Sequence, residues 1–128
     1  MMSDGERPGV TPIIPCNDID AAEAWWNRLG FTRPPGQDYG DYRMLTDGEG
    51  DVHLNRAVEG WLVPGRNPFG VYVYTRRVDS IAEAMRDAVI ERGSAPEHKP
   101  WGMYEVSLNG PDELLVRVGW PSRLATAD

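Results

Sequence analysis

Residues 99–120 read Lys-Pro-Trp-Gly-Met-Tyr-Glu-Val-Ser-Leu-Asn-Gly-Pro-Asp-Glu-Leu-Leu-Val-Arg-Val-Gly-Trp. Apolar and polar side chains alternate in two runs of this stretch, residues 104–108 and 114–118. The sequence Asn-Gly-Pro-Asp at residues 109–112 separates the two runs. Alternation with a period of two, interrupted by turn-forming residues, is typical of a β-hairpin. The stretch therefore predicts a hairpin with a slightly long turn.

A tryptophan introduces this hairpin. Pro100 and Gly102 flank Trp101, so the large indole side chain stands on stiff, tightly turned backbone. A tryptophan in such a place can cap the core of a sheet, or it can form the wall of a binding site. The rest of the chain decides between the two roles.

The composition is that of an ordinary globular protein. The 128 residues include 41% hydrophobic and 26% charged side chains, which suits one domain, or two small modules that share a core. No apolar run approaches the roughly 20 residues that cross a membrane, and the polar residues 1–9 predict a disordered lead-in rather than a signal peptide. Cys16 is the only cysteine, which excludes an internal disulfide or a cysteine-based zinc site and favours a cytoplasmic location.

The net charge of −7 limits the classes of partner. Nucleic-acid-binding proteins normally carry a basic surface, and no basic cluster here is longer than Arg76-Arg77. Long-range attraction favours a cationic ligand. The same acidity also serves a cytoplasmic protein simply by keeping it in solution, and charge alone favours that simpler explanation.

The remaining strands follow from runs of β-forming residues bounded by Gly, Pro and Asp. They are expected at residues 10–16, 31–33, 39–46, 51–57 and 69–75. Two prolines make the first of these an edge strand, or a strand whose prolines face away from a neighbour, because proline cannot donate to a ladder. A loop is expected at residues 94–98.

Two amphipathic stripes predict helices. The first stripe contains Ile19, Ala22, Trp26 and Leu29, and the second contains Val78, Ile81, Met85 and either Ala88 or Val89. Caps are expected at Asn17 or Asp18 for the first helix and at Asp79 or Ser80 for the second, with Gly30 and Gly93 as the respective ends.

The order of strands and helices repeats at an offset of about 60 residues. Ala22-Glu23-Ala24 recurs as Ala82-Glu83-Ala84 at that offset. We therefore predict an α+β fold of two βαβββ modules, whose mixed sheets curl into one cup with the helices outside. The first module spans about residues 10–57, the linker 58–68 and the second module about 69–121; residues 1–9 and 122–128 are the ends.

Two segments resemble a known superfamily. Residues 25–31 read Trp-Trp-Asn-Arg-Leu-Gly-Phe, and residues 99–106 read Lys-Pro-Trp-Gly-Met-Tyr-Glu-Val. They are similar to the helix end and the Pro-Trp-Gly-x-Arg-Glu-Phe motif of the glyoxalase/bleomycin-resistance/dioxygenase superfamily, also called the vicinal oxygen chelate superfamily. Within it, the chain looks most like the bleomycin-resistance proteins. The likeness covers residues 10–121, and the chain departs from the pattern at Tyr104, Gly110 and Glu113.

The resemblance also implies where a metal would be held. Enzymes of the superfamily bind a divalent ion through four positions, which fall here at Thr11, His53, Gly70 and Arg117. Only His53 is an ordinary metal ligand, and Arg117 places a permanent positive charge where a cation would lie. The sequence therefore predicts no metal and no other cofactor. Glu105 and His53 could act as acid and base without a metal, although nothing in their spacing singles them out.

A ligand site is predicted on the cup's inner face. Counting with a period of two places Tyr72, Tyr74, His53, Asn55, Glu105 and Ser107 toward the cavity. The resemblance adds Trp101 as a wall that stacks on a planar heterocycle. The aromatic that opposes it in the family falls near Pro34 or Pro35 here, so Tyr39, Tyr42 or Trp61 is a substitute. The complete predicted set is Trp101, Met103, Glu105, Tyr72, Tyr74, His53, Asn55, Trp61, Tyr39, Tyr42, Ser107 and Arg117.

Two questions remain open at this point. Glu105 and Arg117 can form a salt bridge between strands, or they can contact a ligand. The leading functional hypothesis is non-catalytic binding and sequestration of a small, planar, aromatic antibiotic, whose positive charge is left open, by a homodimer that shares its clefts. The alternatives are a metal-dependent lyase, isomerase or dioxygenase of the same fold, and a regulatory protein with a vestigial cleft.

Overall fold

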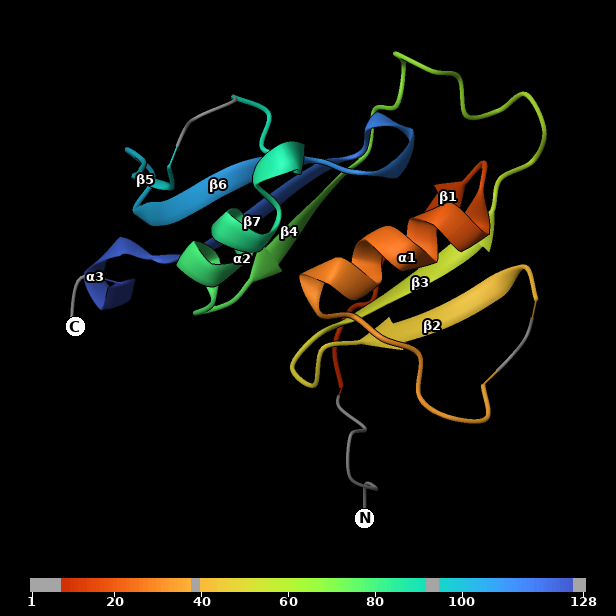
Figure 1. Ribbon diagram of the computed structural model, residues 1–128, viewed down its shortest axis with the longest axis horizontal. Coiled ribbons are helices and arrows are strands. Elements are labelled where there is room, and N and C mark those ends of the chain that lie inside the picture. Colours follow the sequence, from red (N-terminus) through yellow and green to blue (C-terminus); the bar gives the residue numbers. More distant parts are fainter. Residues whose placement is uncertain (1–7, 38–39, 92–94, 126–128) are drawn as a thin grey trace. The chain divides into compact units, whose positions relative to one another are not determined.

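The computed structural model describes residues 8–37, 40–91 and 95–125 (Figure 1). The chain divides into two compact units, the first ending at Leu62 and the second beginning at Val63. This division lies inside the 58–68 connection. None of the helices in the described ranges is long and apolar enough to span a membrane.

The first unit is a three-stranded mixed sheet with one helix. It contains β1 (Ile13–Cys16), α1 (Ile19–Leu29), β2 (Tyr42–Thr46) and β3 (Asp51–Arg56). The strand order is β1-β3-β2, with β1 parallel and β2 antiparallel to β3. The proline-containing strand β1 therefore lies at an edge, as its sequence predicts.

Helix α1 begins and ends where the sequence places its caps. The Asp18 side chain accepts a hydrogen bond from the Ala21 N–H at 3.1 Å, and Gly30 closes the helix with a φ of 108°. The predicted stripe is buried: Ile19, Ala22, Trp26 and Leu29 all lie in the core. Trp26 also packs edge-on against Phe31, at 5.3 Å between ring centroids.

The second unit is a four-stranded mixed sheet in the order β4-β7-β6-β5. Its elements are β4 (Gly70–Tyr74), α2 (Val78–Ala84), the 3₁₀ turn η1 (Arg86–Ala88), β5 (Glu97–His98), β6 (Met103–Asn109), the 3₁₀ turn η2 (Pro111–Glu113), β7 (Leu115–Pro121) and α3 (Ser122–Ala125). Strand β4 is parallel to β7, and β6 is antiparallel to β7. The predicted hairpin is thus β6 and β7.

The two units share one topology, which confirms the α+β class with two mixed sheets. In each, the first strand lies at a sheet edge, a helix follows it, and the last strand returns parallel to the first. The repeated Ala-Glu-Ala sequences fall in α1 and α2. Closure of the two sheets into one cup stays a prediction.

Four predicted elements need correction: the strands expected at 31–33 and 39–46 in the first unit, and the loop expected at 94–98 and the tail expected at 122–128 in the second. Residues 31–33 form no strand; Thr32 makes an isolated bridge with Thr46, because Pro34 and Pro35 follow and lack the N–H groups that would extend a ladder. Strand β2 begins at Tyr42 rather than at residue 39. In the second unit, the expected loop at 94–98 contains the short strand β5, and the expected tail begins with α3.

The second helix is shorter than predicted. It begins at Val78 and ends at Ala84, and Val89 is already extended and bridges to Leu108 of β6. The predicted end at Gly93 is therefore wrong, because pairing with the sheet interrupts the helix; Gly93 itself lies outside the described residues. Neither Asp79 nor Ser80 is the cap, since both fall inside the helix.

The turn between β6 and β7 makes hydrogen bonds to residues 65–67, near the start of the second unit. Asp112 and Glu113 have φ values of 57° and 62°, in the left-handed region that non-glycine residues rarely adopt. The Asn67 side-chain amide donates to the Asp112 carbonyl at 3.1 Å, and the Gly65 N–H donates to the Glu113 carboxylate. On the other side of the division, the Asn17 amide donates to the Leu62 carbonyl at 3.0 Å.

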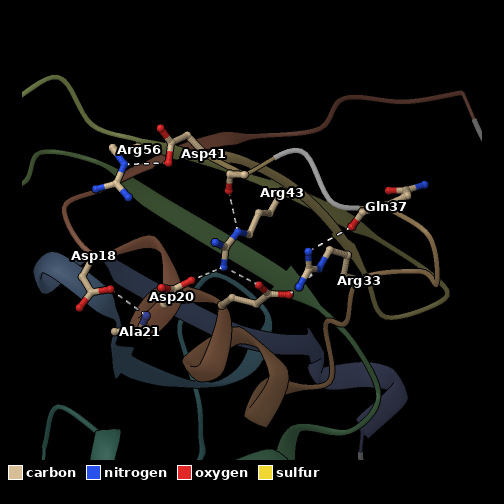
Figure 2. Close-up of polar contacts among 10 residues, drawn as sticks. Asp18, Asp20, Ala21, Arg33, Gln37, Asp41, Arg43 and Arg56 are labelled. Atoms are coloured by element: carbon tan, nitrogen blue, oxygen red, sulfur yellow. Dashed lines mark hydrogen bonds and ion pairs between the residues drawn. The ribbon is translucent and has the colours of Figure 1, made fainter.

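The buried carboxylate of Glu23 joins α1 to the strand region of the first unit. Figure 2 shows its two partners, Arg33 and Arg43. Glu23 accepts hydrogen bonds from Arg43 at 2.8 Å and from Arg33 at 3.1 Å. Arg43 also pairs with Asp20 at 2.7 Å, and its Nε donates to the Gly40 carbonyl at 2.9 Å. Only 11% of the Glu23 side chain is exposed, so solvent screens these interactions poorly.

This network predicts a difference between two glutamates at equivalent positions of the repeat. We expect Glu23→Ala to lower the free energy of unfolding by about 2 kcal/mol, because it leaves two arginines without their shared partner. Glu83→Ala is the matched control, because it replaces the glutamate of the second Ala-Glu-Ala sequence. The Glu83 side chain is 72% exposed and forms an ion pair with Arg86. We expect that control to lose less than about 0.5 kcal/mol. Equal losses in urea-induced unfolding would contradict the assignment.

Candidate functional site

The β6–β7 hairpin separates the core of the second unit from a polar face. Val106, Leu108, Val116 and Val118 are buried, as the alternation predicts. The intervening residues pair across the two strands, Glu105 with Gly119 and Ser107 with Arg117. These intervening residues carry the polar groups of the candidate site.

Glu105 is the buried hub of this face, with 2% of its surface exposed. Its Oε1 accepts hydrogen bonds from the Tyr72 hydroxyl and from the Trp101 indole Nε1, both at 2.9 Å. Its Oε2 lies 3.8 Å from Arg117 Nε. The salt bridge between β6 and β7 that the sequence allows is therefore present, and the same carboxylate also holds two aromatic side chains.

Trp101 lies in the turn directly before β6, and 57% of its surface is exposed. The backbone turns tightly around it: Gly102 has a φ of 85°, and its N–H donates to the Lys99 carbonyl at 3.0 Å. The Arg117 guanidinium lies 5.8 Å from the centre of the indole ring. Trp101 is thus an exposed aromatic surface on a constrained turn, with its indole nitrogen hydrogen-bonded.

Tyr72 reaches Glu105 by crossing over Gly119. A Cβ atom at Gly119 would clash with the Tyr72 hydroxyl and would lie 3.0 Å from the Glu105 Cβ. Burial raises the pKa of the Tyr72 phenol, and the hydrogen bond to Glu105 raises it further. The sequence analysis missed Gly119, although a glycine inside a strand is a signal for a close approach.

Further aromatic side chains lie beside Tyr72. Tyr74 is 6.2 Å from Tyr72 between ring centroids and packs edge-on against Trp120 at 5.2 Å. The Arg76 guanidinium lies over the Trp120 ring at 5.2 Å. Tyr74 was predicted to belong to the site, and Trp120 was not.

A partly open pocket of about 240 Å³ lies on the second unit. Among the predicted site residues, Glu105, Ser107 and Arg117 line it. The lining that sequence reasoning did not find comes mainly from the segments before β6: Val89, Ile90, Glu91, Ala95, Glu97 and Lys99. Met103 belongs to β6 but does not line this pocket.

The other predicted residues belong to the first unit. The Tyr42 hydroxyl is hydrogen-bonded to His53 Nδ1 at 2.6 Å, and Asn55 pairs with Tyr42 across the two strands. Trp61 is 80% exposed. Tyr39 lies outside the described residues. The assembly of these residues with Trp101 into one site stays a prediction.

Within residues 8–37, 40–91 and 95–125, no three His, Cys, Asp or Glu side chains gather where they could hold a metal ion. Two of the four metal-ligand positions that the resemblance implies have partners within the protein. His53 is hydrogen-bonded to Tyr42, and Arg117 forms an ion pair with Glu105.

A curated relative decides the family. A bleomycin resistance protein of Klebsiella pneumoniae is 30% identical over 120 residues, which cover 85% of this chain and 89% of the relative. The chain belongs to the bleomycin resistance protein family. This confirms the resemblance seen in the sequence. No protein-family model matches the chain.

Solved structures agree with this membership. A bleomycin-binding protein complexed with bleomycin is 26% identical, with a TM-score of 0.71, covering 89% of this chain and 98% of the other. A bleomycin resistance determinant encoded on the transposon Tn5 shares the fold with a TM-score of 0.72 at 24% identity, covering 90% of this chain and 98% of the other.

The departure from the family motif at Tyr104 has a local explanation. The Tyr104 hydroxyl donates to the Asp79 carboxylate at 2.6 Å, which joins β6 to the first turn of α2. This hydrogen bond, together with burial, raises the pKa of Tyr104 to about 12. The residue at the motif's arginine position therefore serves the packing of the helix on the sheet.

The close approach of the Tyr72 ring to Gly119 leaves no room for a methyl group at that position. We expect Gly119→Ala to lower the free energy of unfolding by about 2 kcal/mol, because the Tyr72 ring must leave its place on Glu105. Gly70→Ala is the matched control in β4, since a Cβ there meets only ordinary contacts, with the Leu115 carbonyl oxygen nearest at 3.6 Å. Thermal unfolding followed by circular dichroism checks both variants. An unchanged Gly119→Ala protein would show that Tyr72 does not need this close approach.

Proposed function

We propose that this protein binds and sequesters a small planar, aromatic antibiotic of the bleomycin type without altering it chemically. The observation that carries the proposal is the Trp101 ring, which is 57% exposed yet fixed through its indole nitrogen in a member of the bleomycin resistance family. An exposed ring held in one orientation offers a stacking surface to a flat heterocycle.

The energetics suit binding. Stacking of aromatic rings contributes about 0.5–1.5 kcal/mol beyond the burial of area, and fixing the ring in advance reduces the entropy lost on association. Sequestration needs affinity and protein concentration only, because each bound molecule is removed from the free pool. The net charge of −7 attracts a cationic drug at long range, which supports a cationic ligand.

The bleomycin resistance relatives do not favour the alternative of a lyase, isomerase or dioxygenase. Catalysis has no role in the proposed function. We propose a cytoplasmic location, because sequestration there would protect the intracellular targets of a drug. We propose that the predicted residues of the first unit, including Tyr42 and Trp61, also contact the ligand. Trp61, which is 80% exposed, is the proposed second aromatic of the site.

Trp101 is expected to carry measurable affinity. Titration calorimetry with bleomycin should show that Trp101→Ala weakens binding about tenfold or more, which corresponds to about 1.4 kcal/mol. Phe69→Ala, which removes an aromatic side chain that is 54% exposed in the same unit, is the matched control and should bind like the wild type. Absence of bleomycin binding by the wild-type protein would reject this ligand, and equal affinity of Trp101→Ala and wild type would reject the stacking wall.

We further propose that the protein is a homodimer in which modules of two chains share each cleft, as the resemblance implies. Multi-angle light scattering should then give twice the 14.3 kDa mass of one chain. Bleomycin should bind with one molecule per chain. A monomeric protein that still binds bleomycin with this stoichiometry would contradict the shared cleft while leaving sequestration intact.

A further inference from the structure

We propose that Glu105 is a positioning residue: it orients the Trp101 ring for stacking and is not the counter-ion of a cationic ligand. The part of this inference that concerns affinity rests on the proposed function. The part that concerns the orientation of Trp101 stands on the geometry of the second unit alone.

The hydrogen-bonding capacity of Glu105 is directed inward. One oxygen already accepts from both Tyr72 and Trp101 at 2.9 Å, and the other faces Arg117 Nε at 3.8 Å. Only 2% of the residue is exposed, so a ligand meets almost none of its surface. A carboxylate in this setting is stabilised by its own neighbours, because donors and an opposite charge replace the water it has lost.

Arg117 completes the arrangement around the indole. Its guanidinium lies 5.8 Å from the Trp101 ring centre, and its Nε is buried without a hydrogen-bond partner among the described residues. The same Nε lies 3.8 Å from Glu105 Oε2, so the carboxylate that accepts from Trp101 also faces the cation near its ring. Two contacts thus constrain Trp101: the hydrogen bond at its nitrogen and the cation near its ring.

The geometry separates two roles that a glutamate in a drug-binding site can have. A counter-ion attracts a cationic ligand through its charge, so replacing it with the uncharged amide abolishes its contribution. A positioning residue acts through its acceptor oxygen, which the amide of glutamine retains. Glu105→Gln therefore distinguishes the roles, and Glu105→Ala removes both.

The first readout needs no ligand. The indole N–H resonance of Trp101, assigned by its loss in Trp101→Phe, should exchange slowly with solvent in the wild type and in Glu105→Gln. In Glu105→Ala, exchange should be at least about tenfold faster, as expected for the loss of roughly 1.4 kcal/mol of protection. An unchanged exchange rate in Glu105→Ala, or rapid exchange in Glu105→Gln, would overturn the positioning role. Glu105→Gln decides the matter alone if Glu105→Ala does not fold.

The second readout is bleomycin affinity by calorimetry. Glu105→Gln should stay within about threefold of the wild type, whereas Glu105→Ala should weaken binding about tenfold. Glu97→Gln is the matched control for lost charge, because Glu97 lines the same pocket with a side chain that is 61% exposed. A tenfold loss in Glu105→Gln, with no loss in Glu97→Gln and slow indole exchange, would identify Glu105 as the counter-ion. If the wild type does not bind bleomycin, the proposed ligand fails, and the exchange measurement still decides the positioning role.

Discussion

The carboxylate of Glu105 lies where a charge is costly, and the candidate site is built from the groups that compensate for it. Tyr72 and Trp101 donate to one of its oxygens and Arg117 faces the other, so residues from β4, β7 and the turn before β6 meet at one point. Removing any one of them leaves the carboxylate with fewer groups to compensate for its burial. An exposed tryptophan would ordinarily sample several rotamers, and here it is tied to the sheet.

The two units use the same topology for different purposes. In the first, the buried carboxylate is Glu23 on the helix, and its arginine partners secure α1 to the strand region. In the second, the equivalent Glu83 is exposed, and the buried carboxylate is Glu105 on the sheet. The repeat therefore preserves the order of elements, while the placement of one charge distinguishes a structural network from a candidate binding surface.

The sequence predicted the features that depend on local periodicity. The α1 stripe, its Asp18 cap and Gly30 end, and the alternation in β6 and β7 all follow from spacings of 3.6 and 2 residues. It did not predict the early end of α2 at Ala84, because pairing of Val89 with Leu108 is a contact between distant residues. The same limit explains why Trp101 and Glu105 were named as site residues without the hydrogen bond that joins them, and why Gly119 was not named.

A side-chain hydrogen bond holds the connection between the units on each side of their division. Asn17 holds the Leu62 carbonyl, while the left-handed turn at Glu113 holds the Gly65 N–H. Only Val63 and Pro64 lie between these two contacts. Residues 58–68 read as a long flexible linker in the sequence, but these two hydrogen bonds leave only two of these residues unheld between Leu62 and Gly65. The chain would tolerate a cut, a new pair of termini or an inserted domain better at Glu59 and Gly60, which are exposed and lie outside this stretch.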